Sequence, residues 1–532
     1  MIRVTQVKLT IKHTQEALLK KLLTLLHIKE EDVLSYTIRR QSIDARKKPA
    51  LFFVYTIDVE VKEERKLLKR HQKNANISKI SLVPYVFPSS GERKLSHRPV
   101  VVGSGPAGLF CTYMLAKAGY KPLLIERGAS VKERIKDVET FWETGELLPN
   151  SNVQFGEGGA GTFSDGKLNT VVKDSSGRNT EVLELFVKFG APAEILYVNK
   201  PHIGTDLLCK IIHRIRTAII KYGGEVRFHT QLTNISCNNQ TLESIEVNHE
   251  ETIKTEALIL ALGHSARDTF EMLYNVGLEM QAKSFALGVR IEHPQSLINQ
   301  AQYGMEAPEL PAADYKLTAQ LANGRSVYTF CMCPGGYVLN ASSEDKKLAI
   351  NGMSYHARDG ENANSAVVVN VTPKDYKSNH PLAGLAFQRS LEEKAFRLGN
   401  GCIPIQRFED YCKGVKTTKE MTILSNTKGK AVYANIRDIF PQELQEALEE
   451  GIYAFDKKLR GFASKDAILS AVESRTSSPI RIPRKDSFLS SITGVYPCGE
   501  GAGYAGGITS AAIDGLKVAE AIASTYANLI ED

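Results

Sequence analysis

The stretch from Val100 to Gly108 reads VVVGSGPAG, and it decides the fold of this chain. Its valines predict a short buried strand, and its glycines follow with the spacing G-x-G-x-x-G. The residues after them predict a helix over 107–117. A strand, a glycine-rich turn and a helix in this order begin a Rossmann-like α/β domain that binds a dinucleotide.

Each position of this turn has a mechanical reason. Gly103 permits the tight turn, Gly105 lets a pyrophosphate approach the backbone, and Gly108 lets the helix pack closely on the strand. Pro106 and Ala107 open the helix, whose N-terminus attracts phosphate groups. We therefore expect these five residues to bind the cofactor.

A second predicted strand, over 123–125, delivers an acidic residue to the same place. Glu126 stands 18 positions after Gly108, which fits the acid that accepts hydrogen bonds from a ribose diol. An acid here suits the unphosphorylated ribose of FAD or NAD better than that of NADP. Arg127 follows it and is expected to line the same site.

The C-terminal part of the chain decides between FAD and NAD. Residues 494–509 read GVYPCGEGAGYAGGIT and lead into a predicted helix. They resemble flavoproteins of the glutathione-reductase type, in which an acid after a glycine holds the ribityl chain and the next helix directs its N-terminus at the flavin. The resemblance assigns the first role to Gly499 and Glu500 and the second to Gly507 and Ile508. A helix N-terminus there stabilises negative charge on reduced flavin, so FAD is the expected cofactor.

Two strand-like segments, near 224–236 and 255–262, agree with FAD. The second ends at Gly263 and resembles a strand and turn of the same flavoprotein superfamily. The first begins with GGEVRF and resembles the strand whose backbone reads the adenine. Val226 is therefore expected to contact the adenine.

A second G-x-G-x-x-G spans 156–161, but no apolar strand leads into it and no apolar helix follows. We interpret it as a backbone loop that donates N–H groups to the phosphate or ring of the flavin, with a plain surface loop as the alternative. Because no other segment supplies a second Rossmann turn, NAD(P)H is expected only as a transient donor. The residues of this loop assigned to the cofactor are Gly158, Gly159, Ala160, Gly161 and Ser164.

Long strings in one order carry a wider resemblance from about residue 97 to the end. They include FGEGGAGTFSDGKL, LALGHSARDTF, TFCMCPGGYV and ESRTSSPIRI. On these strings the chain resembles the uncharacterised FAD-dependent dehydrogenases once labelled NAD-utilising. The resemblance implies FAD binding and oxidoreduction without naming a substrate. Kinship with geranylgeranyl-reductase-like and aminoacetone-oxidase-like flavoproteins implies one nucleotide domain with an inserted substrate domain.

Candidate catalytic residues lie between the nucleotide-binding segments. Cys333, in the Cys-x-Cys of residues 331–333, is a candidate redox or flavin-facing thiol, with ordinary buried thiols as the alternative. His356 is a candidate proton donor and Arg475 a candidate anion binder, with surface loops and paired arginines as the alternative. No second Cys or His pair has ligand spacing, so no metal site is expected.

The 532 residues, of which 42% are hydrophobic and 24% charged, predict a globular protein of about three domains. We expect a basic α+β module over 1–96, an FAD-binding domain split into 97–275 and 486–532, and an inserted mixed α+β substrate domain over 276–485. Eight sparse cysteines and the lack of a recognisable signal or long apolar run predict a cytoplasmic protein without a membrane span.

Charge is uneven along the chain, because residues 1–96 hold 20 Lys and Arg against 10 Asp and Glu. A solvated basic face is the simpler explanation, and a nucleic-acid partner is the alternative. The expected function is an FAD-dependent oxidoreductase that transfers a hydride to or from a small molecule. The alternatives are a flavin monooxygenase or oxidase, and an RNA-associated flavoprotein that uses the basic module.

Overall fold

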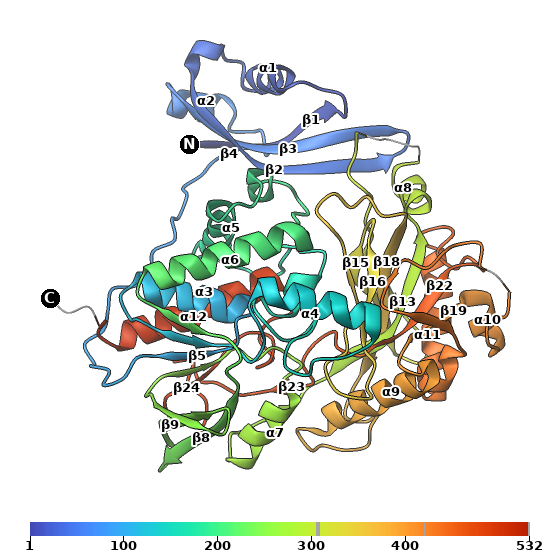
Figure 1. The fold of residues 1–532 in the computed structure, drawn as a ribbon. Helices are drawn as coiled ribbons and strands as arrows, with labels where there is room; N and C mark the ends of the chain where they lie inside the picture. The colour runs from blue at the N-terminus through green and yellow to red at the C-terminus, as the bar shows by residue number, and fades with distance from the viewer. Residues whose placement is uncertain (305–308, 420, 530–532) are drawn as a thin grey trace.

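The computed structural model describes residues 1–304, 309–419 and 421–529. Its larger sheets are a five-stranded parallel sheet, a seven-stranded mixed sheet and a four-stranded antiparallel sheet, with helices packed around them (Figure 1). This mixed α/β architecture with a Rossmann-like parallel sheet is the predicted fold class. Among the described helices, none combines the length and apolarity needed to cross a membrane.

The predicted strand and turn lie at the centre of the parallel sheet. The strand order is β24-β11-β5-β6-β7, so the C-terminal strand pairs beside β11 and completes the sheet. Three of the strands, β5, β6 and β11, are wholly apolar and buried, as parallel strands covered on both faces must be. The bounds are β5 (Val100–Val102), β6 (Leu123–Ile125), β7 (Glu225–Arg227), β11 (Leu258–Leu260) and β24 (Val495–Pro497).

Different elements cover the two faces of the parallel sheet. Val101 points into a cluster with the helices on one face, whereas Val100 and Val102 point at a three-stranded antiparallel sheet and a helix on the other. The helices of the first face are α3 (Pro106–Lys117), α5 (Arg178–Lys188), α6 (Thr205–Lys221) and α12 (Ile508–Thr525). The second face carries β8 (Leu232–Asn238), β9 (Thr241–Val247), β10 (Glu251–Lys254) and α7 (Arg267–Asn275).

Residues 224–236 form two strands in two different sheets, not one strand-like segment. The backbone turns at His229, which has a φ of 51°, and the chain then leaves the parallel sheet for the antiparallel one. The positive φ interrupts the extended backbone at this point, and the apolar pattern alone did not indicate the break.

The N-terminal module has the element order βαββαβ and the sheet order β2-β3-β1-β4, which is a ferredoxin-like topology. Thr14 caps the first helix by accepting a hydrogen bond from the Ala17 N–H at 3.2 Å. Gln41 exchanges two backbone hydrogen bonds, each of 2.8 Å, with Tyr197 and Asn199, so the module docks on the body. Its bounds are β1 (Ile2–Thr10), α1 (Gln15–Leu26), β2 (Val33–Lys47), β3 (Ala50–Val61), α2 (Glu64–Arg70) and β4 (Ile77–Lys79).

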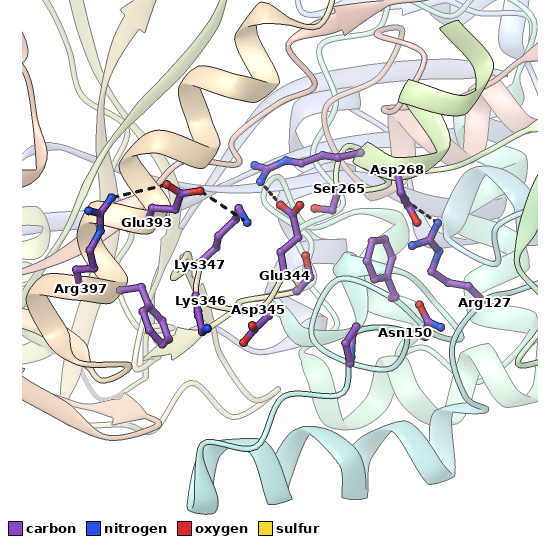
Figure 2. A pocket seen from close by; sticks show the side chains of 15 residues that line it. Arg127, Asn150, Ser265, Asp268, Glu344, Asp345, Lys346, Lys347, Glu393 and Arg397 are labelled. Carbon is purple, nitrogen blue, oxygen red and sulfur yellow. Dashed lines mark hydrogen bonds and ion pairs between the residues drawn. The ribbon is translucent and has the colours of Figure 1, made fainter. Parts of the chain in front are cut away.

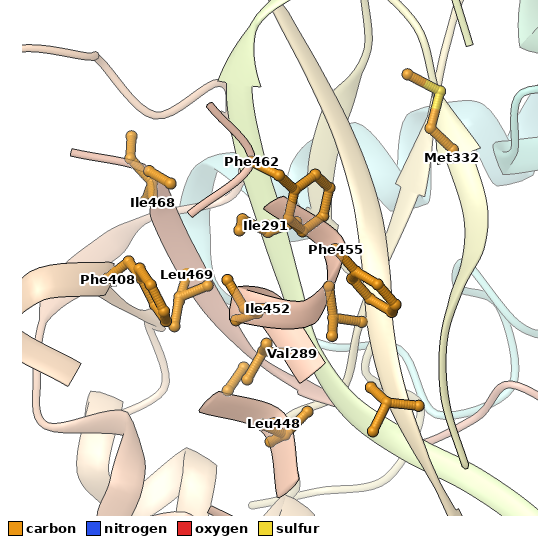
Figure 3. Packing of buried hydrophobic residues seen from close by; sticks show 14 of the residues in the cluster. Val289, Ile291, Met332, Phe408, Leu448, Ile452, Phe455, Phe462, Ile468 and Leu469 are labelled. Atoms are coloured by element: carbon orange, nitrogen blue, oxygen red, sulfur yellow. The ribbon is translucent and has the colours of Figure 1, made fainter. Parts of the chain in front are cut away.

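The seven-stranded sheet has one apolar face and one polar face, and the polar face also carries a small apolar patch of Ala286, Ala366 and Val368. Val289 and Ile291 of β13 pack with Leu448 and Ile452 of α11 in the main core (Figure 3). Arg290, between them, points to the opposite face because side chains alternate along a strand. The order is β14-β15-β18-β13-β22-β19-β21. The bounds are β13 (Phe285–Pro294), β14 (Thr318–Gln320), β15 (Ser326–Cys333), β18 (Asn362–Val371), β19 (Ile403–Arg407), β21 (Ala431–Tyr433) and β22 (Ile468–Glu473), with α9 (Ala383–Gly399), α10 (Phe408–Lys413) and α11 (Gln442–Asp456) against the apolar face.

The remaining elements connect these parts. A small sheet of β16 (Tyr337–Asn340), β17 (Ile350–Met353) and β20 (Thr427–Lys428) lies near the polar face, and β12 (Gln281–Ala282) pairs with β23 (Ile480–Arg481) where the chain enters and leaves the seven-stranded sheet. Two further helices are α4 (Val131–Thr144) and α8 (Gln295–Tyr303).

Candidate functional site

A cavity of about 560 Å³ runs from the carboxyl edge of the parallel sheet to the polar face of the seven-stranded sheet. Open α/β sheets bind ligands at this edge. Most of the residues predicted from sequence line it. They are Gly103, Gly105, Pro106, Ala107, Glu126, Arg127, Gly159, Ala160, Gly161, Ser164, Gly263, Arg475, Glu500, Gly507 and Ile508.

Three predicted glycines stand behind the cavity wall and shape it. A Cβ on Gly108 would lie 1.8 Å from the Gly103 carbonyl oxygen, so only glycine lets α3 pack this closely on the turn. The Gly158 N–H donates to the Ser104 carbonyl at 2.9 Å and joins the second glycine-rich loop to the first. The Gly499 N–H donates to Asp514 Oδ2 at 2.8 Å and anchors the C-terminal turn to α12.

Three other predicted residues also lie outside the lining. Val226 sits within β7, and the cavity is lined instead by residues 230–232, which follow the turn at the end of that strand. His356 faces the Ile203 carbonyl, 2.9 Å from its Nδ1, away from the cavity. Cys333 is fully buried, while its neighbour Cys331 reaches the cavity.

Glu126 is buried at the end of the cavity next to the first glycine-rich turn, which we call the nucleotide end. Its Oε2 accepts hydrogen bonds from the N–H and hydroxyl of Ser104, at 2.9 and 2.8 Å. Its Oε1 accepts from the N–H groups of Gly128 and Gly156, both at 3.0 Å. One carboxylate thus joins the phosphate turn, its own strand end and the second glycine loop. The Ser104 hydroxyl holds the position on Glu126 Oε2 that a ribose hydroxyl would need, and it can rotate away. The predicted contact between Glu126 and a ribose stays a prediction.

Arg134 of α4 holds the second glycine-rich loop in place. It is fully buried, and it donates to the carbonyl oxygens of Asn152, Glu157 and Gly159 at 2.8, 2.8 and 2.9 Å. Burial lowers the pKa of Arg134 to about 10, and nearby Glu126 opposes this shift. The loop is therefore a rigid backbone surface, although no feature of the sequence around Arg134 indicated this role.

At the far end, a charged cluster follows the glycine loop. Lys167 Nζ donates to Asp165 Oδ2 at 2.6 Å and to the Met332 carbonyl. Arg358 Nε donates to Asp165 Oδ1 at 2.9 Å. Burial would raise the pKa of Asp165, but Lys167 and Arg358 hold it below its ordinary value. Two cations against one buried carboxylate leave a net positive charge beside the start of α12.

The polar face of the seven-stranded sheet closes this end. Arg290 Nε donates to Glu473 Oε2 at 2.8 Å, Nη1 to Asn364 Oδ1 at 2.7 Å and Nη2 to Asn351 Oδ1 at 2.9 Å. Burial raises the pKa of Glu473 to about 7 against the opposing effect of Arg290. Burial likewise raises the pKa of Glu500 to about 7, opposed by Lys283. Both carboxyl groups line the cavity and are poised to exchange protons near neutral pH.

Arg475 reaches the cavity wall but is already paired. Its Nη2 donates to Glu392 Oε2 at 2.8 Å and its Nε to Glu392 Oε1 at 3.0 Å. Arg267 donates to the same carboxylate, with both distances 2.8 Å. Burial opposes ionisation of Glu392, yet the two arginines hold its pKa well below its ordinary value. Arg475 therefore positions the wall of the site, and the nearby carboxylate of Glu473 pairs with Arg290 instead.

A second cavity, of about 790 Å³, adjoins the nucleotide end and shares Arg127, Phe155 and Ser265 with the first. Most of its charged side chains pair with one another, as Figure 2 shows for Arg127 with Asp268 and for Glu393 with Lys347 and Arg397. Arg127 also covers the Phe155 ring, with 4.4 Å between its Cζ and the ring centroid. It therefore forms part of the wall between the two cavities.

The structure brings together several residues that sequence reasoning missed. Lys167 belongs to the quoted string FGEGGAGTFSDGKL, and Cys331 belongs to the quoted Cys-x-Cys, so both lay within reach of a motif. Arg290 and Glu473 are 183 positions apart in the sequence. They meet because their strands, β13 and β22, are neighbours in the sheet. No local pattern marks such a pair.

Comparisons with known proteins agree with this geometry. A family model described as FAD-dependent protein, C-terminal domain-like matches residues 284–476, and an NAD(P)-binding Rossmann-like domain matches residues 101–145. A domain of unknown function matches residues 1–60. An uncharacterised protein of Clostridium beijerinckii is 48% identical over 532 residues, which cover 99% of each chain.

The chain belongs to the family of this clostridial protein, a family of FAD-dependent proteins. It is an FAD-dependent oxidoreductase, as the sequence predicts, and neither domain description names a substrate.

Solved structures with similar folds are distant. Quinol fumarate reductase of E. coli is 12% identical, with 81% of this chain and 70% of that chain covered and a TM-score of 0.36. L-Proline dehydrogenase of P. horikoshii is 11% identical, with 81% and 93% covered and a TM-score of 0.33. Glycine oxidase of Bacillus cereus is 10% identical, with 80% and 95% covered and a TM-score of 0.33. These values carry no argument about activity.

Proposed function

We propose that this protein binds FAD along the first cavity and transfers a hydride between the flavin and a small organic molecule. One observation carries the proposal: a single cavity joins the glycine turn, the N-terminus of α12 and the polar face of the seven-stranded sheet. Bound FAD would supply the hydride chemistry, and the chain would supply binding, orientation and exclusion of water.

The nucleotide end fits a pyrophosphate. Gly105 has a φ of −68°, and a Cβ built on it meets only the Gly159 Cα at 3.9 Å. The space in front of this glycine is thus open, as close approach of a phosphate to the backbone requires. The N-terminus of α3 begins at the next residue and favours negative charge.

The other end fits a flavin ring. The N-terminus of α12, at Ile508, and the cation Lys167 both line it, and both favour the negative charge of a reduced flavin. Gly506, in the turn before α12, has nothing within 4 Å of a built Cβ. We propose that Glu500 and Glu473 hold or move a proton near the ring, because burial places their pKa values near neutrality.

We propose that the segment 276–485 is the substrate domain and that the substrate is an apolar or unsaturated molecule. Tyr315 and Phe330 supply apolar lining at the ring end, beside the charged cluster. We also propose that the protein is a dehydrogenase and that NAD(P)H reduces its flavin in a transient encounter. We do not propose RNA binding, because Leu51 of the module lies in the main core and Gln41 pairs with the body.

The test begins with the visible spectrum of the purified protein before and after denaturation. Flavin bands that are released on unfolding and identified as FAD are the expected result. Anaerobic addition of NADH or NADPH should then bleach the bound flavin, and slow reoxidation by oxygen should separate a dehydrogenase from an oxidase or monooxygenase. A colourless protein that takes up no added FAD would overturn the proposal.

A further inference from the structure

Cys331 and Cys333 flank an irregularity in β15 at the ring end of the cavity. Phe330 pairs with Ala366 and Cys333 pairs with Asn364, so β15 holds one residue more than its partner strand. Cys331 has a φ of 43°, which is rare for a residue other than glycine. Such bulges bend a strand and re-aim a side chain, often beside an active site.

The bulge gives the two cysteines different surroundings. Cys331 is partly exposed and lines the cavity, whereas Cys333 is fully buried and does not. The Cys333 thiol lies 3.2 Å from the Cys331 carbonyl oxygen, to which it donates. One cysteine thus lines the cavity, and the second lies directly behind it.

Two cationic side chains, Lys167 and Arg290, lie beside the partly exposed Cys331. Lys167 donates to the carbonyl of Met332, between the two cysteines, and Arg290 Nη1 donates to the Cys331 carbonyl at 3.2 Å. A hydrogen bond from the Cys333 thiol, together with these cations, lowers the pKa of Cys331 although burial opposes the shift. Burial raises the pKa of Cys333. Three carboxyl groups lie near the two cysteines: Asp165, Glu473 and Glu500. Asp165 pairs with Lys167, and Glu473 pairs with Arg290.

We propose that Cys331 and Cys333 form a dithiol–disulfide couple that exchanges an electron pair with the flavin. The inference rests on the proposed function, because the flavin is the electron partner. In oxidation of the couple, two thiols lose two electrons and two protons and form one S–S bond. The oxidised flavin takes both electrons and one proton, and the second proton passes to water. Cys331 is the thiol that contacts the ligand, and Cys333 closes the disulfide.

The spacing permits this bond. The Cα atoms of residues two apart on a regular strand are about 6.6 Å from each other. This distance is at the upper end of the Cα separations that disulfides span, roughly 4.4–6.8 Å. An extra residue in a bulge shortens the rise, and Met332 points to the opposite side, into the main core. The spacing of the two cysteines therefore falls within the range that a disulfide can span.

Peptide mass provides a direct test in the unmodified, flavin-loaded protein. Trypsin cuts after Arg325 and Lys346, and the peptide between them contains Cys331 and Cys333 and no other cysteine. The protein is oxidised with diamide, alkylated and digested. This peptide should lose two hydrogens and resist alkylation, and dithionite should restore both thiols. Alkylation of both cysteines after oxidation would overturn the proposal.

An anaerobic dithionite titration tests the electron exchange. The oxidised wild type should consume about twice as much reductant per flavin as Cys331→Ser or Cys333→Ser, because a disulfide takes up a second electron pair. Cys402→Ser, a substitution of a partly exposed cysteine outside the cavity lining, is the matched control and should consume the wild-type amount.

The outcomes separate this inference from the proposed function. A yellow protein in which wild type and Cys331→Ser consume equal reductant overturns the couple and leaves the flavoprotein standing. A colourless protein overturns the proposed function itself. If Cys333→Ser fails to fold, Cys331→Ser and the peptide mass of the wild type still decide the matter.

Discussion

The two ends of the cavity are built by different means. At the nucleotide end the wall is mainly backbone, with glycines at the closest approaches and one carboxylate, Glu126, that binds the loops together. At the ring end the wall consists of buried charged side chains, such as Arg290 with Glu473 and Lys167 with Asp165. The nucleotide end therefore depends on close fit to the backbone, and the ring end depends on buried charged side chains. The same kind of substitution should have different consequences at the two ends.

The largest effect is expected at the charged end. Arg290→Met leaves Glu473 buried without its partner, which should cost about 3–5 kcal/mol of the free energy of unfolding. Urea unfolding measures the loss. The double variant Arg290→Met/Glu473→Leu should recover at least half of it, because an apolar pair of similar size replaces the ion pair. A single variant as stable as the wild type would show that charge does not maintain this end.

The next effect lies at the backbone end. Gly108→Ala places a methyl group 1.8 Å from the Gly103 carbonyl oxygen, so the turn and α3 must separate. Overpacking of this kind should cost about 1–3 kcal/mol and abolish flavin retention. Thermal unfolding of the apoprotein and the flavin absorbance together measure both losses. Unchanged melting would mean that the turn adapts without strain.

Gly105→Ala is the matched contrast to that substitution. Its methyl group enters open space, so the melting temperature of the apoprotein should not change. The same methyl group occupies the position of a phosphate, and the FAD dissociation constant should rise at least tenfold, about 1.4 kcal/mol. Fluorescence titration of the apoprotein with FAD gives the constant. Wild-type affinity would place the phosphates elsewhere.

A further effect concerns the pH dependence of stability at the ring end. Burial raises the pKa of Glu500 to about 7, from an unfolded value near 4.3. The folded state therefore binds more protons than the unfolded state between these values, so stability from this group is full below about pH 4 and is lost as pH rises through 7. Glu500→Gln should flatten this part of the stability profile. If the slope of the free energy of unfolding between pH 5 and 7 does not change, this pH dependence belongs to Glu473 or another group.

The sequence predicted the backbone end far better than the charged end. The turn at 103–108 and Glu126 follow from local spacing, because contiguous residues make a strand, a turn and a helix. Val226 was placed on the right strand, but the turn at His229 moves the lining to residues 230–232.

Long-range pairing explains what local patterns could not show. The partners of Arg475 and Arg290 come from elements far apart in the chain, so sequence identified Arg475 without its partner Glu392. The Cys-x-Cys was visible, but the one-residue bulge that accompanies the placement of Cys331, and not Cys333, in the cavity lining was not.

The position of β24 has a consequence for synthesis of the protein. β11 pairs with β5 on one side and with β24 on the other, and β24 begins at Val495. At roughly 5–20 residues per second, tens of seconds separate translation of β11 from that of its last neighbour. For that time the nascent chain carries an apolar edge strand and half of a flavin site. A chaperone that covers this edge, or early association with the cofactor, would protect the chain against aggregation while the ribosome finishes the C-terminal segment.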